Sequence, residues 1–183
     1  MKKISAICIV LAILSIMCGC DGNNMFEKPK LSNETIVNGQ MDALLAALEC
    51  RDTEGLISLF APKALNNTEN IQHTVDLLYS YYQGKHISYD NWNATGESTE
   101  RNDNHVVKKL YGTYDVVTDE DTYRFAFLYV AEDSSDPDNV GLQSVYIIKR
   151  DDDIDPQYAY RGDQAYKPGI HIGVQNKLPD EVL

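Results

Sequence analysis

Apolar residues in the first third of the chain recur every three or four positions, which is the spacing of one helix face. Ser32 and Asn33 are both good N-caps, and a helix is expected to begin after one of them. The stripe that follows predicts the buried face of this helix. Its members are Val37, Met41, Leu44, Leu45 and Leu48.

Two shorter helices are predicted next. Asp52 caps the segment 53–60, and Pro62 is expected to stop it, because proline lacks the amide hydrogen of a helix interior. Thr68 is expected to cap a third helix that ends at Gly84. Its apolar stripe is Ile71, Val75, Leu78 and Tyr82.

After Gly84 the apolar period changes from helical spacing to alternation by two, which is typical of strands. The predicted strands are rich in β-branched and aromatic residues. They are 85–92, 105–117, 122–130 and 140–150. Polar residues predict a long loop at 93–104, a tight hairpin turn at 118–121 and an acidic loop at 131–139. The remaining tail looks irregular, with one short strand at 169–174.

Helices followed by a meander of strands predict an α+β domain, with three N-terminal helices packed on one face of an antiparallel sheet. The side chains expected in the core share the apolar face of their element. They are Leu44, Leu48, Phe60, Ile71, Val75, Phe125 and Phe127. Cys50, in the apolar stretch at the end of the first helix, is expected to be a buried small hydrophobe.

The leader indicates where the protein resides. Lys2 and Lys3 precede the uncharged run 4–17, which is shorter than the roughly 20 residues of a membrane span and fits a signal peptide. Gly19 before Cys20 resembles a bacterial lipobox, which implies a Cys20 that carries a diacylglyceryl group and acyl chains such as palmitate. An ordinary cleaved signal peptide or an N-terminal anchor helix is the alternative.

The chain organisation follows from that leader. Residues 1–19 are the expected signal peptide, 20–31 a tether, 32–175 the folded domain and 176–183 a C-terminal tail. The membrane is then a partner through lipid on Cys20, and the domain lies on the extracytoplasmic side of the cell membrane. The net charge of −12 makes nucleic acid an unlikely partner, since an acidic domain repels phosphates.

Two stretches carry a resemblance to known families. The segment "LLAALECRDTEGLISLFAPKAL" (44–65) resembles the opening of the nuclear transport factor two-like, or cystatin-like, superfamily. That resemblance implies a curved sheet wrapped around the first helix, a cone-shaped roll with a pocket. The stretches "YDVVTDEDTYRF", "DPDNVGLQSVYI" and "YKPGI" are similar to an uncharacterised Gram-positive lipoprotein family, a domain of unknown function, over roughly residues 33–172.

The tyrosines are the main candidates for a site. The chain has 12 tyrosines but only one tryptophan and four phenylalanines. Strand alternation predicts that Tyr114, Tyr129 and Tyr146 point into the cone, together with Trp92, and line a ligand pocket. The alternative is a packed core in which the tyrosine hydroxyls reach water or backbone.

No motif for catalysis or metal binding is present in the sequence. The four histidines are scattered, and the oxygen-rich stretches 136–139 and 151–156 match no calcium loop. We therefore expect no catalytic residue, no metal ligand and no cofactor. The expected function is a lipid-anchored binding or interaction domain for a small molecule or protein partner. The alternative is a small pocket enzyme, an isomerase, cyclase or hydrolase with a carboxylate–tyrosine site.

Overall fold

The structure is a computed structural model that describes residues 31–92, 95–102, 105–153 and 166–173. The expected signal peptide, nearly all of the tether, Cys20 and the C-terminal tail 176–183 lie outside these residues. The described helices are α2 (Asn33–Cys50), α3 (Thr53–Ser58), α4 (Pro62–Asn66) and α5 (Ile71–Tyr81). The strands are β1 (His86–Asn91), β2 (Gly96–Asn102), β3 (His105–Thr118), β4 (Thr122–Asp133), β5 (Gly141–Lys149) and β6 (Gly169–Ile172).

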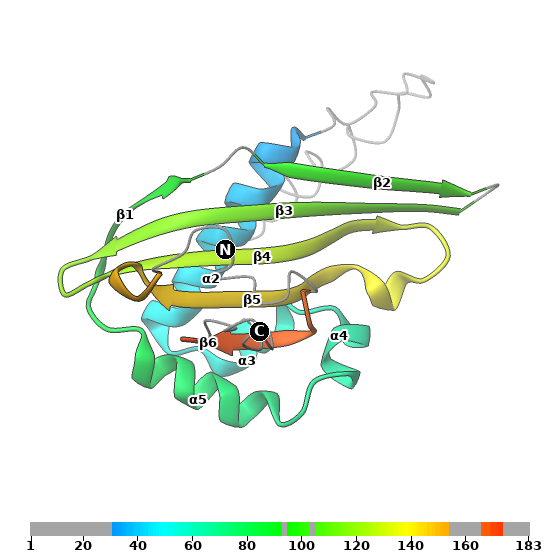
Figure 1. The fold of residues 1–183 in the computed structure, drawn as a ribbon. Coiled ribbons are helices and arrows are strands. Elements are labelled where there is room, and N and C mark those ends of the chain that lie inside the picture. Colours follow the sequence, from blue (N-terminus) through cyan, green and yellow to red (C-terminus); the bar gives the residue numbers. More distant parts are fainter. Residues whose placement is uncertain (1–30, 93–94, 103–104, 154–165, 174–183) are drawn as a thin grey trace, which may run out of the picture. The chain divides into compact units, whose positions relative to one another are not determined.

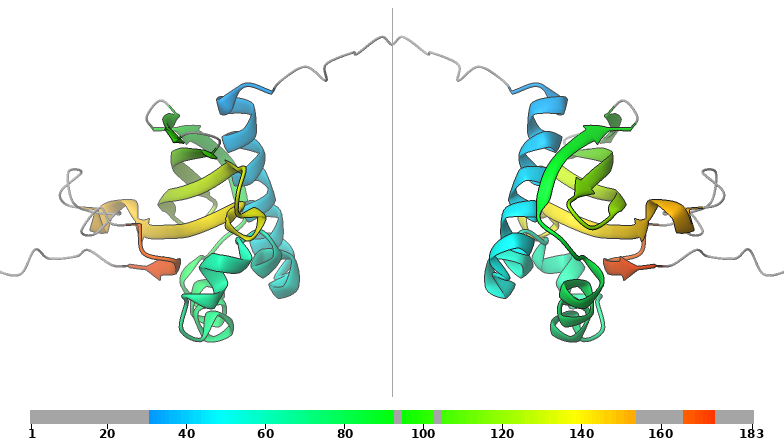
Figure 2. Two further views of the ribbon diagram at one scale, coloured as in Figure 1. Left: turned by 90° about the vertical axis from the view of Figure 1, so that its right-hand side faces the viewer. Right: turned by 90° about the vertical axis from the view of Figure 1, so that its left-hand side faces the viewer.

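These elements form a mixed α+β domain with one six-stranded curved sheet, as Figures 1 and 2 show. The strand order is β1-β3-β4-β5-β6, and β2 also pairs with β3. All pairs are antiparallel except β5 with β6, so the expectation of a purely antiparallel sheet is wrong at this edge. The long β3 carries β2 along its first half and β1 along its second half.

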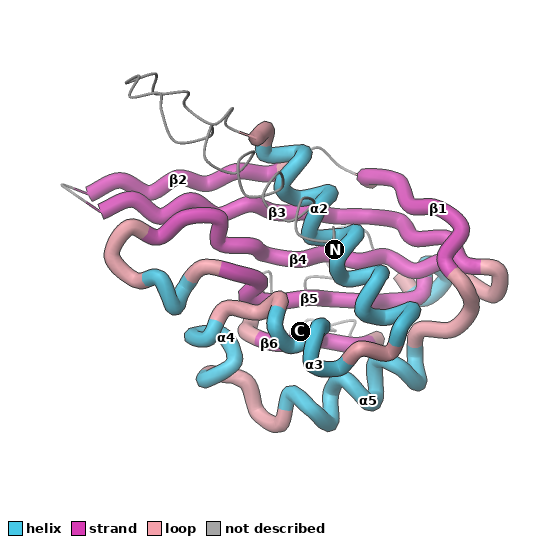
Figure 3. Tube along the Cα trace, turned by 180° about the vertical axis from the view of Figure 1, so that it is seen from behind, coloured by secondary structure: helices cyan, strands magenta, loops and turns pink. Residues whose placement is uncertain are grey.

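Helix α2 crosses one face of the sheet, as seen from behind in Figure 3. The hydroxyl of Ser32 accepts a hydrogen bond from the amide of Thr35 at 3.1 Å, which confirms the predicted N-cap. A Cβ on Gly112 of β3 would lie 2.6 Å from Cγ1 of Val37. Glycine at this position therefore lets the helix approach the strand closely.

The predicted core is confirmed for six of its seven side chains. Ile71 is only half-buried, because it lies in the first turn of α5 at the edge of the cluster. Strand side chains that belong to the same buried cluster as the apolar stripe of α2 define what we call the helix face of the sheet. They are Leu110, Tyr114, Val116, Tyr123, Phe125, Phe127, Leu142, Val145 and Ile147. The opposite side, with Asp115, Arg124 and Tyr146, is called the outer face.

Four helices stand before the sheet in the described residues, not three. Pro62 is expected to stop a helix, but it begins α4. The first amide of a helix has no partner within the helix, so proline loses no hydrogen bond there, and its fixed φ suits the helix. Helix α3 already ends at Ser58, because Phe60 bridges to β5. The cap of α5 is Asn70 rather than Thr68, since Asn70 accepts from the amide of His73.

Two further expectations are wrong. The predicted loop 93–104 contains β2, whose polar sequence hides the strand; it pairs with β3 from Gly96 to Asn102 as an exposed edge. Cys50 is exposed rather than buried. It lies two positions after Leu48, roughly 200° further around α2, and so faces away from the apolar stripe.

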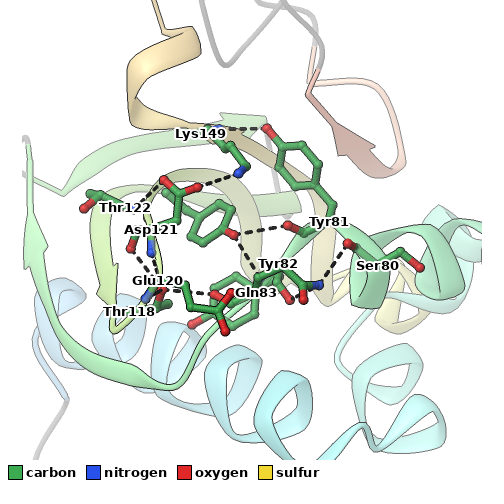
Figure 4. A network of polar contacts seen from close by, with 10 residues as sticks. Ser80, Tyr81, Tyr82, Gln83, Thr118, Glu120, Asp121, Thr122 and Lys149 are labelled. Atoms are coloured by element: carbon green, nitrogen blue, oxygen red, sulfur yellow. Dashed lines mark hydrogen bonds and ion pairs between the residues drawn. The ribbon is translucent and has the colours of Figure 1, made fainter.

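A polar network joins the C-terminal end of α5 to the start of β4 and the end of β5 (Figure 4). The hydroxyl of Tyr123 accepts from the amide of Gln83 at 2.8 Å and donates to the carbonyl of Tyr81 at 3.1 Å. The hydroxyl of Tyr81 accepts from the amide of Lys149 at 2.8 Å, and the ammonium of Lys149 pairs with Asp121. These bonds satisfy backbone groups where the helix ends, so the network is structural.

Among the described helices, none is long and apolar enough to cross a membrane.

Candidate functional site

A β-bulge changes which side chains share a face of the sheet. Leu128 pairs with Ser144, but its neighbour Tyr129 pairs with Leu142, so Gln143 is an extra residue in β5. Beyond such an insertion the alternation of side chains is inverted. A prediction that follows strict alternation along β5 therefore fails at this point.

The bulge separates the predicted tyrosines. Tyr114 lies on the helix face, and Tyr129 packs against the same core. Tyr146 lies on the outer face with Ala126 and Ile148, so the prediction that the three share one interior is wrong for Tyr146. The hydroxyl of Tyr146 accepts from the amide of Lys167 at 3.1 Å.

Trp92 also lies with the outer face. Its ring stands 3.9 Å from the guanidinium carbon of Arg124, a close cation–π contact. The side chain of Trp92 is 40 % exposed. Trp92 and Tyr146 are thus placed apart from Tyr114 and Tyr129, and the four residues do not line a common hollow.

Tyr114 is a core residue. Its side chain is fully buried, and its hydroxyl donates a 2.6 Å hydrogen bond to Oδ1 of Asn38 on α2. The ring stacks on Phe127 and meets Tyr89 edge-on. Burial raises the pKa of Tyr114, so the hydroxyl stays protonated and its bond to the helix is structural.

Tyr129 lines a groove of about 670 Å³ between the helices and the β4–β5 end of the sheet. Burial raises the pKa of Tyr129, and its hydroxyl has no hydrogen-bond partner within the described part of the chain. The hydroxyl is therefore a free donor at neutral pH. The groove is lined by Gln40, Glu54, Ile57, Ser58, Leu59, Phe60, Pro62, Leu65, Tyr129, Val140 and Gly141.

The segment between α3 and α4 holds the groove against the sheet. The amide of Leu142 donates to the carbonyl of Leu59, and the amide of Ala61 donates to the carbonyl of Leu142, each at 2.9 Å. Gly141 allows this approach, since it has φ +133° and a Cβ there would lie 2.7 Å from the nitrogen of Ala61. The bridge at Phe60 thus places two helices beside the start of β5.

A salt bridge supports the same region from outside. The ammonium of Lys63 on α4 lies 2.8 Å from Oδ2 of Asp136 and pairs with it. Asp136 belongs to a turn that is organised by the carboxylate of Asp133, which accepts from Asn139 and His105. These bonds lower the pKa of Asp133. The oxygen-rich stretch 136–139 therefore serves as a folded turn.

No group of three or more His, Cys, Asp or Glu side chains that would suit a metal ion occurs in the described residues. The stretch 151–156 lies partly outside them.

The groove offers an apolar floor with few polar groups. Leu59 and Leu65 are half-buried, Val140 is 36 % exposed, and Gln40 is half-buried. Glu54 is exposed and supplies the groove's charge. Such a hollow suits a small, mainly apolar ligand that makes a few hydrogen bonds.

The sequence reasoning missed a buried charge cluster on the outer face. Arg124 is 0 % exposed; its Nε and Nη2 donate to Asp115 at 2.7 and 2.9 Å, and its Nη1 pairs with the buried Asp153. Burial raises the pKa of Asp153, opposed by the charge of Arg124. A lone arginine within the apolar strand 122–130 is the clue, because a buried charge needs partners.

The comparison with protein families gives one match. A family model described as Domain of unknown function (DUF5104) matches residues 43–150, more than half of the 183-residue chain. The match includes α3 to β5 and most of the groove lining. No curated protein matches the sequence significantly. The chain therefore belongs to the family described as Domain of unknown function (DUF5104).

Proposed function

We propose that the protein is a lipid-anchored, extracytoplasmic, non-catalytic binding domain whose ligand is a small molecule with a largely apolar body and a few polar groups. The groove at Tyr129 is the observation that carries this proposal. It combines about 670 Å³ of space, an apolar floor and a free tyrosine hydroxyl. Binding sites for small molecules have this character, with many apolar contacts and few polar groups that fix orientation.

The anchoring part of the proposal rests on the sequence of the leader. Lys2 and Lys3, the uncharged run 4–17 and the pair Gly19–Cys20 support a signal peptide with lipid on Cys20. Cys20→Ser is expected to abolish labelling by a fatty-acid analogue and to leave the precursor uncleaved. Cys18→Ser is the matched control and is expected to label normally. Equal labelling of Cys20→Ser and the unchanged protein would refute the lipid anchor.

We also propose that the fold is a cystatin-like roll, as in nuclear transport factor two-like domains and Gram-positive lipoproteins. Helix α2 on the face of a curved sheet supports this assignment. In such folds the space between the helices and the sheet is the usual place for a ligand. The Tyr129 groove lies at that boundary, with lining residues from α2, α3, α4, β4 and β5.

The enzyme alternative has less support. Tyr89 donates a 2.6 Å hydrogen bond to Asp42, and burial together with this contact raises the pKa of Tyr89 to about 12. Asp42 is exposed, as is Glu54 in the groove. A carboxylate base of the steroid-isomerase kind works in a desolvated pocket, so neither of these exposed carboxylates has the required surroundings.

Photolabelling of the full chain tests the binding proposal. A neutral alkyl alcohol with a diazirine in its tail is expected to label peptides of the groove, 57–65 and 140–141, as mapped by mass spectrometry. Val140→Trp fills the rim of the groove and is expected to reduce labelling at least several-fold. Ile87→Trp adds the same bulk on β1, where Ile87 is 63 % exposed, and is the matched control. Labelling that is absent, or indifferent to Val140→Trp, would refute the proposal.

A further inference from the structure

The charge that lines the groove is negative. Glu54 is the one ionisable group with a full charge among its lining residues. Lys63 follows the lining residue Pro62 in the sequence, but its ammonium is already paired with Asp136 at 2.8 Å. The phenol of Tyr129 is neutral at pH 7, and burial raises its pKa further. An anionic ligand would therefore meet one carboxylate and no free cation among the lining residues.

We infer that the ligand of this groove is an amphipathic cation: an organic ammonium joined to an apolar body. The inference rests on the proposed function and specifies its ligand class. Glu54 is the partner for the ammonium, and the apolar lining holds the body. The hydroxyl of Tyr129 is a further polar group that orients a hydrogen-bond acceptor on the ligand.

The burial of the lining residues fits a ligand with two unlike ends. Glu54 is exposed in the first turn of α3, so a charged head beside it stays in water and loses little hydration. Leu59 and Leu65 belong to the same lining and are half-buried, so an apolar body that contacts them is partly sheltered from water. A ligand that is charged throughout would leave that apolar lining unmatched.

The charge of the whole chain acts in the same direction. The formal net charge is −12, so the field around the protein attracts cations and repels anions before contact. This long-range attraction has no preference for one groove. The contact with Glu54 is what distinguishes this site, and it is the contact that the experiment removes.

Three photoprobes test the inference on the full chain. They share one alkyl diazirine tail and differ in the head group, which is trimethylammonium, hydroxyl or sulfonate. The ammonium probe is expected to half-saturate labelling of the groove peptides at a concentration about two- to fivefold lower than the hydroxyl probe, as for an exposed ion pair. The sulfonate probe is expected to label most weakly. High salt, about 1 M, is expected to shrink these differences, because the head group is exposed.

Substitutions at Glu54 decide the role of this carboxylate. Glu54→Gln is expected to remove most of the ammonium preference, and Glu54→Lys to transfer the preference to the sulfonate probe. Asp76→Asn, on the exposed side of α5, changes the net charge by the same amount and is the matched control. It is expected to leave the preference unchanged. Circular dichroism spectra that match the unchanged protein show that each variant is folded.

The outcomes separate the inference from the proposed function. If the hydroxyl probe labels the groove but the ammonium probe has no advantage, the ligand class is wrong and the binding function stands. An advantage that survives Glu54→Gln likewise overturns the inference. If no probe labels the groove of the unchanged protein more strongly than that of Val140→Trp, the binding function is refuted and the inference fails with it.

Discussion

Replacing Arg124 by methionine removes the charge at the centre of the outer-face cluster while keeping much of the side-chain volume. In the structure Arg124 is fully buried, and it donates to both carboxylate oxygens of Asp115 and to Oδ2 of Asp153. Within the described residues, the other oxygen of Asp153 is buried and has no hydrogen-bond partner. Arg124→Met therefore leaves Asp153, which is 4 % exposed, without its closest cation.

The expected loss of unfolding free energy is about 3–5 kcal/mol at pH 7, the usual cost of removing one partner from a buried ion pair. Arg150 provides a matched control, because it faces the same carboxylates at longer distances of 3.5 and 3.9 Å and is 38 % exposed. Arg150→Met is expected to cost under about 1 kcal/mol, in the range of exposed pairs.

The loss should depend on pH in a definite direction. Burial already raises the pKa of Asp153, and Arg124 opposes that rise. Without Arg124 the pKa rises further above the unfolded value of about 3.9. A raised folded pKa contributes stability below the unfolded pKa, and this contribution is lost as pH rises through the folded pKa. The deficit of Arg124→Met is thus expected to shrink from pH 7 to pH 4.5.

Urea unfolding followed by far-ultraviolet circular dichroism at both pH values measures these differences. Two results would contradict the reasoning. One is a cost below about 1 kcal/mol at pH 7, which would mean that the cluster is hydrated. The other is a deficit that does not change with pH, which would mean that Asp153 is not the group left uncompensated.

Four further predictions concern the core, the groove and the thiol. Leu48→Ala is expected to cost about 2–5 kcal/mol in urea unfolding, because Leu48 is 4 % exposed in the α2 stripe; a cost under about 0.5 kcal/mol would place the stripe at the surface. Tyr114→Phe is expected to lose about 0.5–1.5 kcal/mol of stability with its bond to Asn38 and to leave probe labelling of the groove unchanged; weakened labelling at full stability would reverse that assignment. Gly141→Ala is expected to weaken the Phe60 bridge and speed hydrogen exchange at the amide of Ala61, since a Cβ would lie 2.7 Å from that nitrogen; unchanged exchange would show that the close approach is relaxed. The exposed Cys50 is expected to react with a thiol reagent in the absence of denaturant, and protection until unfolding would show that it is buried.

Much of the fold is predictable from the sequence because it depends on local periodicity. The α2 stripe and the alternation of β3 and β4 are each long enough to identify the element and its buried face. Ser32 supplies a cap whose chemistry is recognisable without any tertiary contact. The tight turn at 118–121 lies between two strands with clear alternation, so the β3–β4 hairpin was predicted as well.

Features that depend on partners distant in sequence were missed. Strand β2 has no apolar alternation and exists because β3 is long enough to pair with it. The bulge at Gln143 depends on how β5 meets β4, and this single inserted residue moved Tyr146 to the outer face. The residues of the groove come from five elements, so Glu54 and Tyr129 come to line one groove only in the folded chain.

The parallel strand β6 has a consequence for how the domain is made. It is the last described strand along the chain, yet it covers the backbone edge of β5, with Gly169 opposite Ser144. During synthesis, β1 to β5 emerge before the residues that protect this edge. A chain that stops before residue 169 would present a bare row of amide and carbonyl groups to other chains. Premature termination products are therefore expected to self-associate more readily than the full chain, because the last four-residue strand covers the edge of β5.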